Sequence, residues 1–107
     1  MSETNKLRHV VMFAFKEGTD AAQIDEIIRR FAALKNLVPG IEALEWGSNN
    51  SPEGLNNGLS HCFLLTFGST EARDAYLPHP DHVAFADWVG EWVESVTVLD
   101  YWATANA

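Results

Sequence analysis

LRHVVMFAF, from Leu7 to Phe15, is apolar on both of the faces that a β-strand presents. Side chains along a strand point alternately to its two sides, so the odd-numbered residues, which include His9 and Phe13, would share one face. The even-numbered residues, among them Val10 and Met12, would share the other. A strand with one solvated face alternates apolar with polar residues, and this one does not. The segment therefore predicts a sheet that is buried on both sides.

The segment that follows this strand predicts a long amphipathic helix and a second strand. Asp20 with Gln23 three residues later resembles a capping box, and apolar residues then recur at helical spacing as far as Leu37. Pro39-Gly40 ends the helix. Residues 41–46 can form a second strand, which would end at Gly47.

Turn-forming residues dominate positions 48–59, which predict a long connection. The elements expected after it are a strand over residues 61–67, a short helix over about 69–76, a helix beginning at Pro80 and a last strand over 96–102. This order is the βαββαβ arrangement of the ferredoxin-like α+β fold, which lays helices on one face of an antiparallel sheet. We expect one domain over residues 1–107, with its core at about 7–102.

The second apolar face of the predicted sheet requires a partner. A bare apolar sheet face is rarely left in water, and an identical sheet is the simplest cover for it. The sequence therefore predicts a homodimer with an isologous contact between two sheets.

The charge balance excludes several classes of partner. A formal net charge of -8 argues against nucleic acid and against anionic membrane surfaces, both of which attract basic proteins. No apolar stretch approaches the ~20 residues of a membrane span, and residues 1–8 lack the apolar core of a secretory signal. The one cysteine, Cys62, allows no intrachain disulfide. These features predict a soluble, cytoplasmic protein.

The heptapeptide from Tyr76 to His82, YLPHPDH, carries the best candidates for proton transfer. Pro80 is favoured in the first turn of a helix, so His82 would lie near the positive end of the helix dipole. That position and burial both disfavour the charged imidazolium, leaving His82 as a neutral general base. Tyr76 would supply a phenol that donates a proton, and His79 is expected to cap the helix.

A pocket is expected around His82. On its helix the residue shares an apolar stripe with Phe85, Ala86, Val89 and Val93, and it therefore faces inward. His9 and His61 have the parity of the large apolar residues of their strands, so both are expected to face the same layer. A flat hydrophobic ligand would suit a pocket walled by Phe13, Ile28, Phe31, Phe63 and Trp88. The alternative for each histidine is a structural hydrogen bond to a nearby backbone group.

No metal or cofactor site is predicted. His79 and His82 are three residues apart, but no His-x-His or Glu-x-x-His pattern accompanies them. The glycines stand singly in turns and form neither a phosphate-binding loop nor a dinucleotide fingerprint, and no serine elbow occurs.

Several segments together resemble the stress-responsive A/B barrel (Dabb) domain, over about residues 7–102. They are His9 to Lys16, Pro39-Gly40-Ile41, Trp46-Gly47, His61 to Phe67, the pattern Tyr76-x-x-His79-Pro80-x-His82, and Asp100-Tyr101. The resemblance implies a dimeric α/β barrel in which two sheets pack face to face with the helices outside. It agrees with the dimer expected from the two-sided strands.

The resemblance also implies roles for residues, because the family includes plant polyketide cyclases with a similar Tyr-x-x-His-Pro-x-His motif. By this likeness His82 would be the general base and Tyr76 its partner, with His9 and His61 around the pocket. Phe31 stands where such a cyclase has a tyrosine, so the pocket wall has one hydrogen-bonding group fewer.

Two hypotheses for the function follow. The first is an acid-base enzyme of cyclase, lyase or isomerase type that acts on an aromatic or polyketide-like carbonyl compound, with a cofactor-free monooxygenase as a variant. The second is a non-catalytic dimer that binds a small molecule or serves a stress response. The sequence leaves the choice between them and the identity of the substrate open.

Overall fold

The computed structural model describes residues 5–104 and contains the predicted elements in the predicted order. They are β1 (Leu7–Phe15), α1 (Ala21–Leu37), β2 (Ile41–Ser48), β3 (His61–Phe67), α2 (Thr70–Tyr76), α3 (Pro80–Val89) and β4 (Val93–Trp102). The prediction of a ferredoxin-like βαββαβ fold is confirmed.

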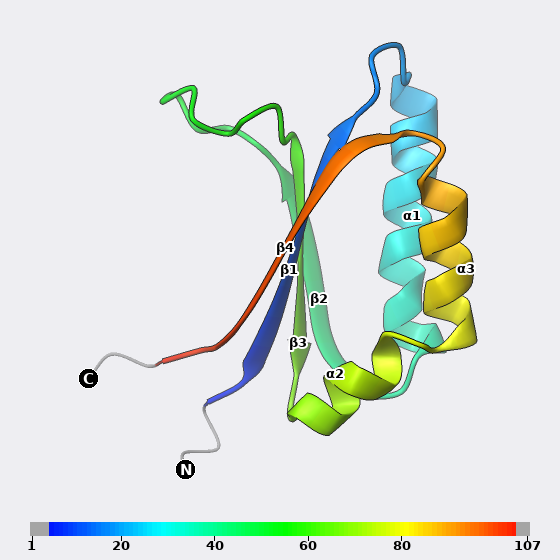
Figure 1. Ribbon diagram of the computed structural model, residues 1–107, viewed down its shortest axis with the longest axis vertical. Helices are drawn as coiled ribbons and strands as arrows, with labels where there is room; N and C mark the ends of the chain where they lie inside the picture. Colours follow the sequence, from blue (N-terminus) through cyan, green and yellow to red (C-terminus); the bar gives the residue numbers. More distant parts are fainter. Residues whose placement is uncertain (1–4, 105–107) are drawn as a thin grey trace.

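The four strands form one antiparallel sheet in the order β2-β3-β1-β4. β1 is central and pairs with β3 and β4, so that Phe13 lies opposite His61 on one side and Val96 on the other. Figure 1 shows α1 and α3 side by side along one face of the sheet, with α2 near one end of it. The connection between β2 and β3 bends away toward the opposite side, which none of the helices within residues 5–104 covers.

The two faces of the sheet are distinct in composition and exposure. The helix-covered face is made by the residues that point toward α1 and α3, chiefly His9, Val11, Phe13, Phe63, Leu65 and Phe67. The open face is made by the alternate residues, chiefly Val10, Met12, Cys62, Leu64, Thr97, Leu99 and Tyr101.

Local capping explains where the helices begin. The Asp20 side chain accepts a hydrogen bond from the backbone N–H of Gln23 at 2.8 Å, as the predicted capping box requires of its first residue. At α3 the Nδ1 of His79 accepts from the N–H of Asp81 at 3.1 Å, and Pro80 occupies the first turn. His79 is therefore the N-cap, and the prediction that Pro80 opens this helix is confirmed.

The last strand begins at Val93, three residues earlier than predicted, and the placement of Val93 on the α3 stripe was wrong. α3 ends at Val89, and a short turn through Gly90 brings the chain back to the sheet. The N–H of Lys16 donates to the carbonyl of Trp92 at 2.8 Å, which starts the pairing of β4 with β1. Val93 follows Val89 at helical spacing by coincidence, since both residues face the interior from different elements.

The core lies between α1 and the helix-covered face. Ile27, Phe31 and Leu34 of α1 are at most 2% exposed and belong to one cluster with the β3 residues Phe63, Leu65 and Phe67. The ring of Phe31 stacks on that of Phe63 with centroids 4.2 Å apart. Within residues 5–104, no helix has the length and apolar character needed to cross a membrane.

Candidate functional site

A cavity of about 290 Å³ opens on the helix-covered side, between β1, β4, α2 and α3. Its lining is mostly apolar and includes Val11, Phe13, Phe31, Leu77, Phe85, Ala86, Val89, Val93, Val96 and Val98. The polar side chains in the lining are those of His9, Tyr76 and His82. An apolar pocket with a few convergent polar groups is typical of a site for a small organic ligand.

His82 is held at the first turn of α3 with one ring nitrogen occupied. Its Nδ1 lies 2.8 Å from the carbonyl oxygen of Leu77, and a carbonyl only accepts hydrogen bonds, so Nδ1 carries a proton. In the neutral ring the Nε2 lone pair is therefore free to accept a proton. The ring centroids of His82 and Tyr76 lie 4.2 Å apart, so the two aromatic rings are in contact.

Tyr76 is fully buried, and its hydroxyl has no hydrogen-bond partner among the residues that the structure describes. Burial raises the pKa of this phenol far above its ordinary value, so the O–H stays protonated and acts as a donor. A buried donor without an acceptor is unfavourable by itself. A ligand oxygen in the adjoining cavity would satisfy it.

His9 is 5% exposed and is anchored from behind the cavity. Its Nδ1 is 2.7 Å from Oδ1 of Asp100, and Oδ2 of the same carboxylate accepts from Nη1 of Arg73 at 2.8 Å. A chain of three charged or polar side chains thus runs from α2 through β4 to β1. Sequence reasoning did not name Asp100 or Arg73 as site residues, although a lone carboxylate in the apolar run VTVLD was a usable signal.

The structure brings together some of the predicted site residues and separates others. His9, Phe13, Phe31, Tyr76 and His82 line the same cavity. Ile28, Phe63, Trp88 and His61 do not belong to its lining.

Phe63 lies in the core, and Ile28 and Trp88 pack against it. Phe63 is wholly buried beneath Phe31, and Ile28 packs against the core cluster. Trp88 lies under the guanidinium of Arg30, 4.2 Å from its carbon to the ring centroid. These contacts are those of packing residues.

His61 lies near the other end of the sheet. It pairs with Phe13, whereas His9 pairs with Leu65, four residues away along β3. At about 3.3 Å per residue this separates the two histidines by roughly 13 Å. His61 instead contacts Ser60, whose Oγ is 2.8 Å from Nδ1, and desolvation lowers the pKa of His61.

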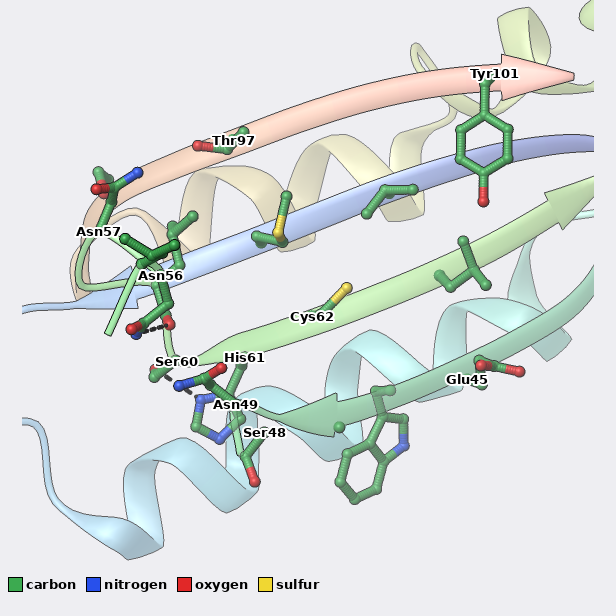
Figure 2. A pocket seen from close by; sticks show the side chains of 18 residues that line it. Glu45, Ser48, Asn49, Asn56, Asn57, Ser60, His61, Cys62, Thr97 and Tyr101 are labelled. Carbon is green, nitrogen blue, oxygen red and sulfur yellow. Dashed lines mark hydrogen bonds between the residues drawn. The ribbon is translucent and has the colours of Figure 1, made fainter. Parts of the chain in front are cut away.

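A second and larger hollow, a trough of about 950 Å³, lies on the open face. Figure 2 shows it between the sheet and the connection that carries Asn49, Asn56 and Asn57, with Cys62 and Thr97 on its floor. Burial and the charge of Glu45 raise the pKa of the Cys62 thiol, which argues against a nucleophilic thiolate. The stronger acid-base arrangement is therefore the helix-side cavity.

Metal ligation finds little support in the part of the chain that is described. No group of three or more His, Cys, Asp or Glu side chains is placed to hold an ion in residues 5–104. The donor set of the helix-side cavity, two imidazoles and a phenol, instead suits hydrogen bonding to an organic ligand.

Sequence comparison finds a family and relatives that include a stress-response protein and an enzyme. The family model described as Stress responsive A/B Barrel Domain matches residues 7–103. The stress-response A/B barrel domain-containing protein HS1 of Arabidopsis thaliana is 38% identical over 99 residues, covering 92% of this chain and 91% of HS1. Olivetolic acid cyclase of Cannabis sativa is 28% identical over 95 residues, covering 89% of this chain and 94% of the cyclase.

Structure comparison finds an enzyme and a dimer of the same fold. Hydroxynitrile lyase from Passiflora edulis superposes with a TM-score of 0.87 at 27% identity, covering 95% of this chain and 96% of the lyase. A dimeric ferredoxin-like protein of unknown function from Jannaschia sp. has a TM-score of 0.78 at 25% identity, covering 90% of this chain and 97% of that protein.

Proposed function

The chain belongs to the Stress responsive A/B Barrel Domain family, and we propose that it is a homodimeric acid-base catalyst of cyclase or lyase type for a hydrophobic carbonyl compound. One observation carries the proposal. The ring of a buried tyrosine, whose hydroxyl has no hydrogen-bond partner within residues 5–104, packs against an imidazole with a free Nε2, and both residues line an apolar cavity. The similarity to a cyclase and to a lyase supports the same reaction classes.

The roles follow from the chemistry of each group. Reactions of these classes need a base that removes a proton and a donor that stabilises negative charge on the carbonyl oxygen. His82 would accept the proton at Nε2, and the Tyr76 O–H would donate to the oxygen. Because its raised pKa keeps Tyr76 protonated, the phenol would serve as a donor across the physiological range.

The cavity walls favour a neutral substrate with one polar end. Among residues 5–104, no Lys, Arg, Asp or Glu side chain lines the cavity, so these residues offer no charge that would neutralise a charged group on the ligand. The polar groups gather near Tyr76, while Phe31, Phe85 and Val98 offer hydrocarbon elsewhere. An aromatic or alkyl carbonyl compound fits this distribution.

The homodimer is proposed from the open face of the sheet. Leu99 is 60% exposed and Tyr101 is 45% exposed in the single chain, beside the half-buried Val10, Met12 and Leu64. A contiguous apolar patch of this kind marks an interaction surface. The fold is shared with proteins described as dimeric, which supports a second copy of this chain as the cover.

A non-catalytic stress protein is the second candidate. The observation that favours it is the 38% identity to HS1, which is higher than the identity to either enzyme. Under this alternative the cavity would bind a ligand without turnover.

The test is a screen of aromatic and polyketide-like carbonyl compounds for binding and turnover, followed by His82→Ala and Tyr76→Phe. Loss of one acid-base group should lower turnover by about 10²- to 10⁴-fold. Tyr101→Phe is the matched control, since it removes the same hydroxyl from the open face and should leave turnover unchanged. The proposal fails if both cavity variants stay folded and treat every compound found as the wild type does.

A further inference from the structure

Behind the helix-side cavity, the Arg73-Asp100-His9 chain has a geometry that the acid-base proposal does not use. We propose that Asp100 and Arg73 are positioning residues that fix the ring of His9 with Nε2 as a hydrogen-bond acceptor for the ligand. The inference rests on the proposed function, because it assigns a ligand contact in the same cavity. It also narrows the substrate class to hydroxy-carbonyl compounds.

The tautomer of His9 follows from its partner. A carboxylate accepts hydrogen bonds and cannot donate them, so the 2.7 Å contact with Oδ1 of Asp100 requires a proton on Nδ1 of His9. In the neutral imidazole the lone pair then belongs to Nε2. That nitrogen makes no hydrogen bond to any residue within the described range, and the His9 side chain lines the cavity.

Asp100 is itself held in place by a permanent cation. The carboxylates of Asp74 and Asp100 raise the pKa of Arg73, so the guanidinium stays charged. Its Nη1 donates a hydrogen bond to Oδ2 of Asp100, which leaves Oδ1 to accept from His9. The fixed carboxylate therefore selects both the tautomer and the orientation of the ring, as a buried carboxylate does for the histidine of a catalytic triad.

The same helix couples this chain to the phenol. Arg73 and Tyr76 both belong to α2 and lie three residues apart, about one helical turn. The ring of His9 packs edge-on against that of Tyr76, with centroids 5.8 Å apart. The charged or titratable groups around His9 are therefore Asp100 from β4, Arg73 and Tyr76 from α2, and His82 beyond Tyr76 on α3.

The hydrogen-bond donors and acceptors that line the cavity indicate the class of substrate that it would bind. Tyr76 offers one donor, and Nε2 of His9 and of His82 offer two acceptors when both rings are neutral. A simple ketone or aldehyde would satisfy only the donor. A compound with a carbonyl oxygen and a hydroxyl, such as an enol or a phenolic ketone, would satisfy the donor and one acceptor as well.

The tautomer can be measured directly by ¹⁵N NMR on protein labelled at histidine, without any ligand or turnover. We expect His9 to carry its proton on Nδ1 in the wild type, and we expect Asp100→Asn to shift the population toward the Nε2–H form. Arg73→Gln should shift it partly and Arg73→Lys should restore it, while Arg29→Gln, which removes an exposed arginine on α1, should change nothing. A His9 protonated on Nε2 in the wild type, or a tautomer unchanged by Asp100→Asn, overturns the inference.

The ligand role is tested with meta-hydroxyacetophenone and its methyl ether as probes. Asp100→Asn should weaken binding of the hydroxyl compound about tenfold, the equivalent of one hydrogen bond. The ether cannot donate to Nε2 of His9 in the wild type, so its binding should not weaken in the variant. Equal binding of the hydroxyl compound by both proteins overturns the assignment. The tautomer result stands apart from the proposed function, since failure of the His82 and Tyr76 screen would not alter it.

Discussion

The two faces of the sheet are built from the same four strands and differ in what completes them. On the helix-covered face Phe63, Leu65 and Phe67 are 0% exposed, because α1 and α3 lie over them. On the open face Leu99 and Tyr101 remain largely exposed. A single chain therefore buries one face of the sheet by itself, whereas burial of the other face requires a second molecule.

The candidate site lies at the margin of the helix-covered face, where the helices no longer cover the sheet. β4 is an edge strand beyond the helices, and its Val96 and Val98 are 53% and 54% exposed although they share the helix-covered side with His9. The cavity uses these residues as its outer wall. A fully packed layer has no room for a ligand, so a site at the margin of the core combines rigid walls with access.

The largest effect is expected from breaking the open face. Leu99→Lys places a charge in the proposed interface. Each protomer contributes this residue to an isologous contact, so the dimer loses the burial of two leucines. Each buried leucine contributes about 1.5–3 kcal/mol, so the dimer should weaken by about 3–6 kcal/mol and its Kd should rise more than a hundredfold. Sedimentation equilibrium measures this, with Leu37→Lys on α1 as the exposed control. A wild type that is monomeric at micromolar concentration would contradict the proposed interface.

Truncation at the helix-covered face should destabilise the fold itself. Phe63→Ala removes a ring with no exposed surface that stacks on Phe31, and comparable substitutions cost about 3–5 kcal/mol. Its neighbour Leu64 points to the open face, so Leu64→Ala should cost clearly less in a variant that is already monomeric through Leu99→Lys. Urea denaturation gives both values, and equal losses would show that the two faces do not differ as described.

Removing the Tyr76 hydroxyl should stabilise the unliganded protein. The Tyr76 O–H is buried and has no hydrogen-bond partner in the part of the chain that the structure describes, a state that costs about 1–3 kcal/mol. Tyr76→Phe keeps the ring and removes the polar group, so the unfolding free energy should rise by about 1–2 kcal/mol at unchanged m-value. Tyr101→Phe, made in the monomeric Leu99→Lys variant where this hydroxyl faces solvent, should stay within about 0.5 kcal/mol of that variant. A less stable Tyr76→Phe protein would mean that the hydroxyl is satisfied after all.

Local patterns in the sequence predicted most of the fold. The two-sided strand at Leu7–Phe15, the cap at Asp20 and the start of α3 at Pro80 each depend on signals within a few residues. The start of β4 was missed because Val93 continues the helical spacing from Val89, and a single glycine between them does not reveal a reversal of the chain.

The candidate site was predictable only as far as it is local. Tyr76 and His82 come from one heptapeptide, and the structure places their rings in contact. Alternation along a strand gives His9 and His61 the same parity as their large apolar neighbours, but strand register decides the position along the sheet, and His61 lies far from His9 in the lining of the open-face trough. Register also brings Asp100 opposite His9, and no periodicity in β4 alone reveals that pairing.

The smallest expected effect that tests the difference between the two faces is a loss of stability at alkaline pH. Burial raises the pKa of Tyr76 in the folded state above the unfolded value of about 10, so the unfolded chain releases this proton first. The stability contributed by the protonated phenol is therefore complete below pH 10 and is lost as the pH rises further. At pH 11 the wild type should lose about 1.4 kcal/mol relative to Tyr76→Phe, measured as the change in their stability difference from pH 8. A constant difference would show that solvent reaches the phenol, and the helix-side cavity would then be as wet as the open face.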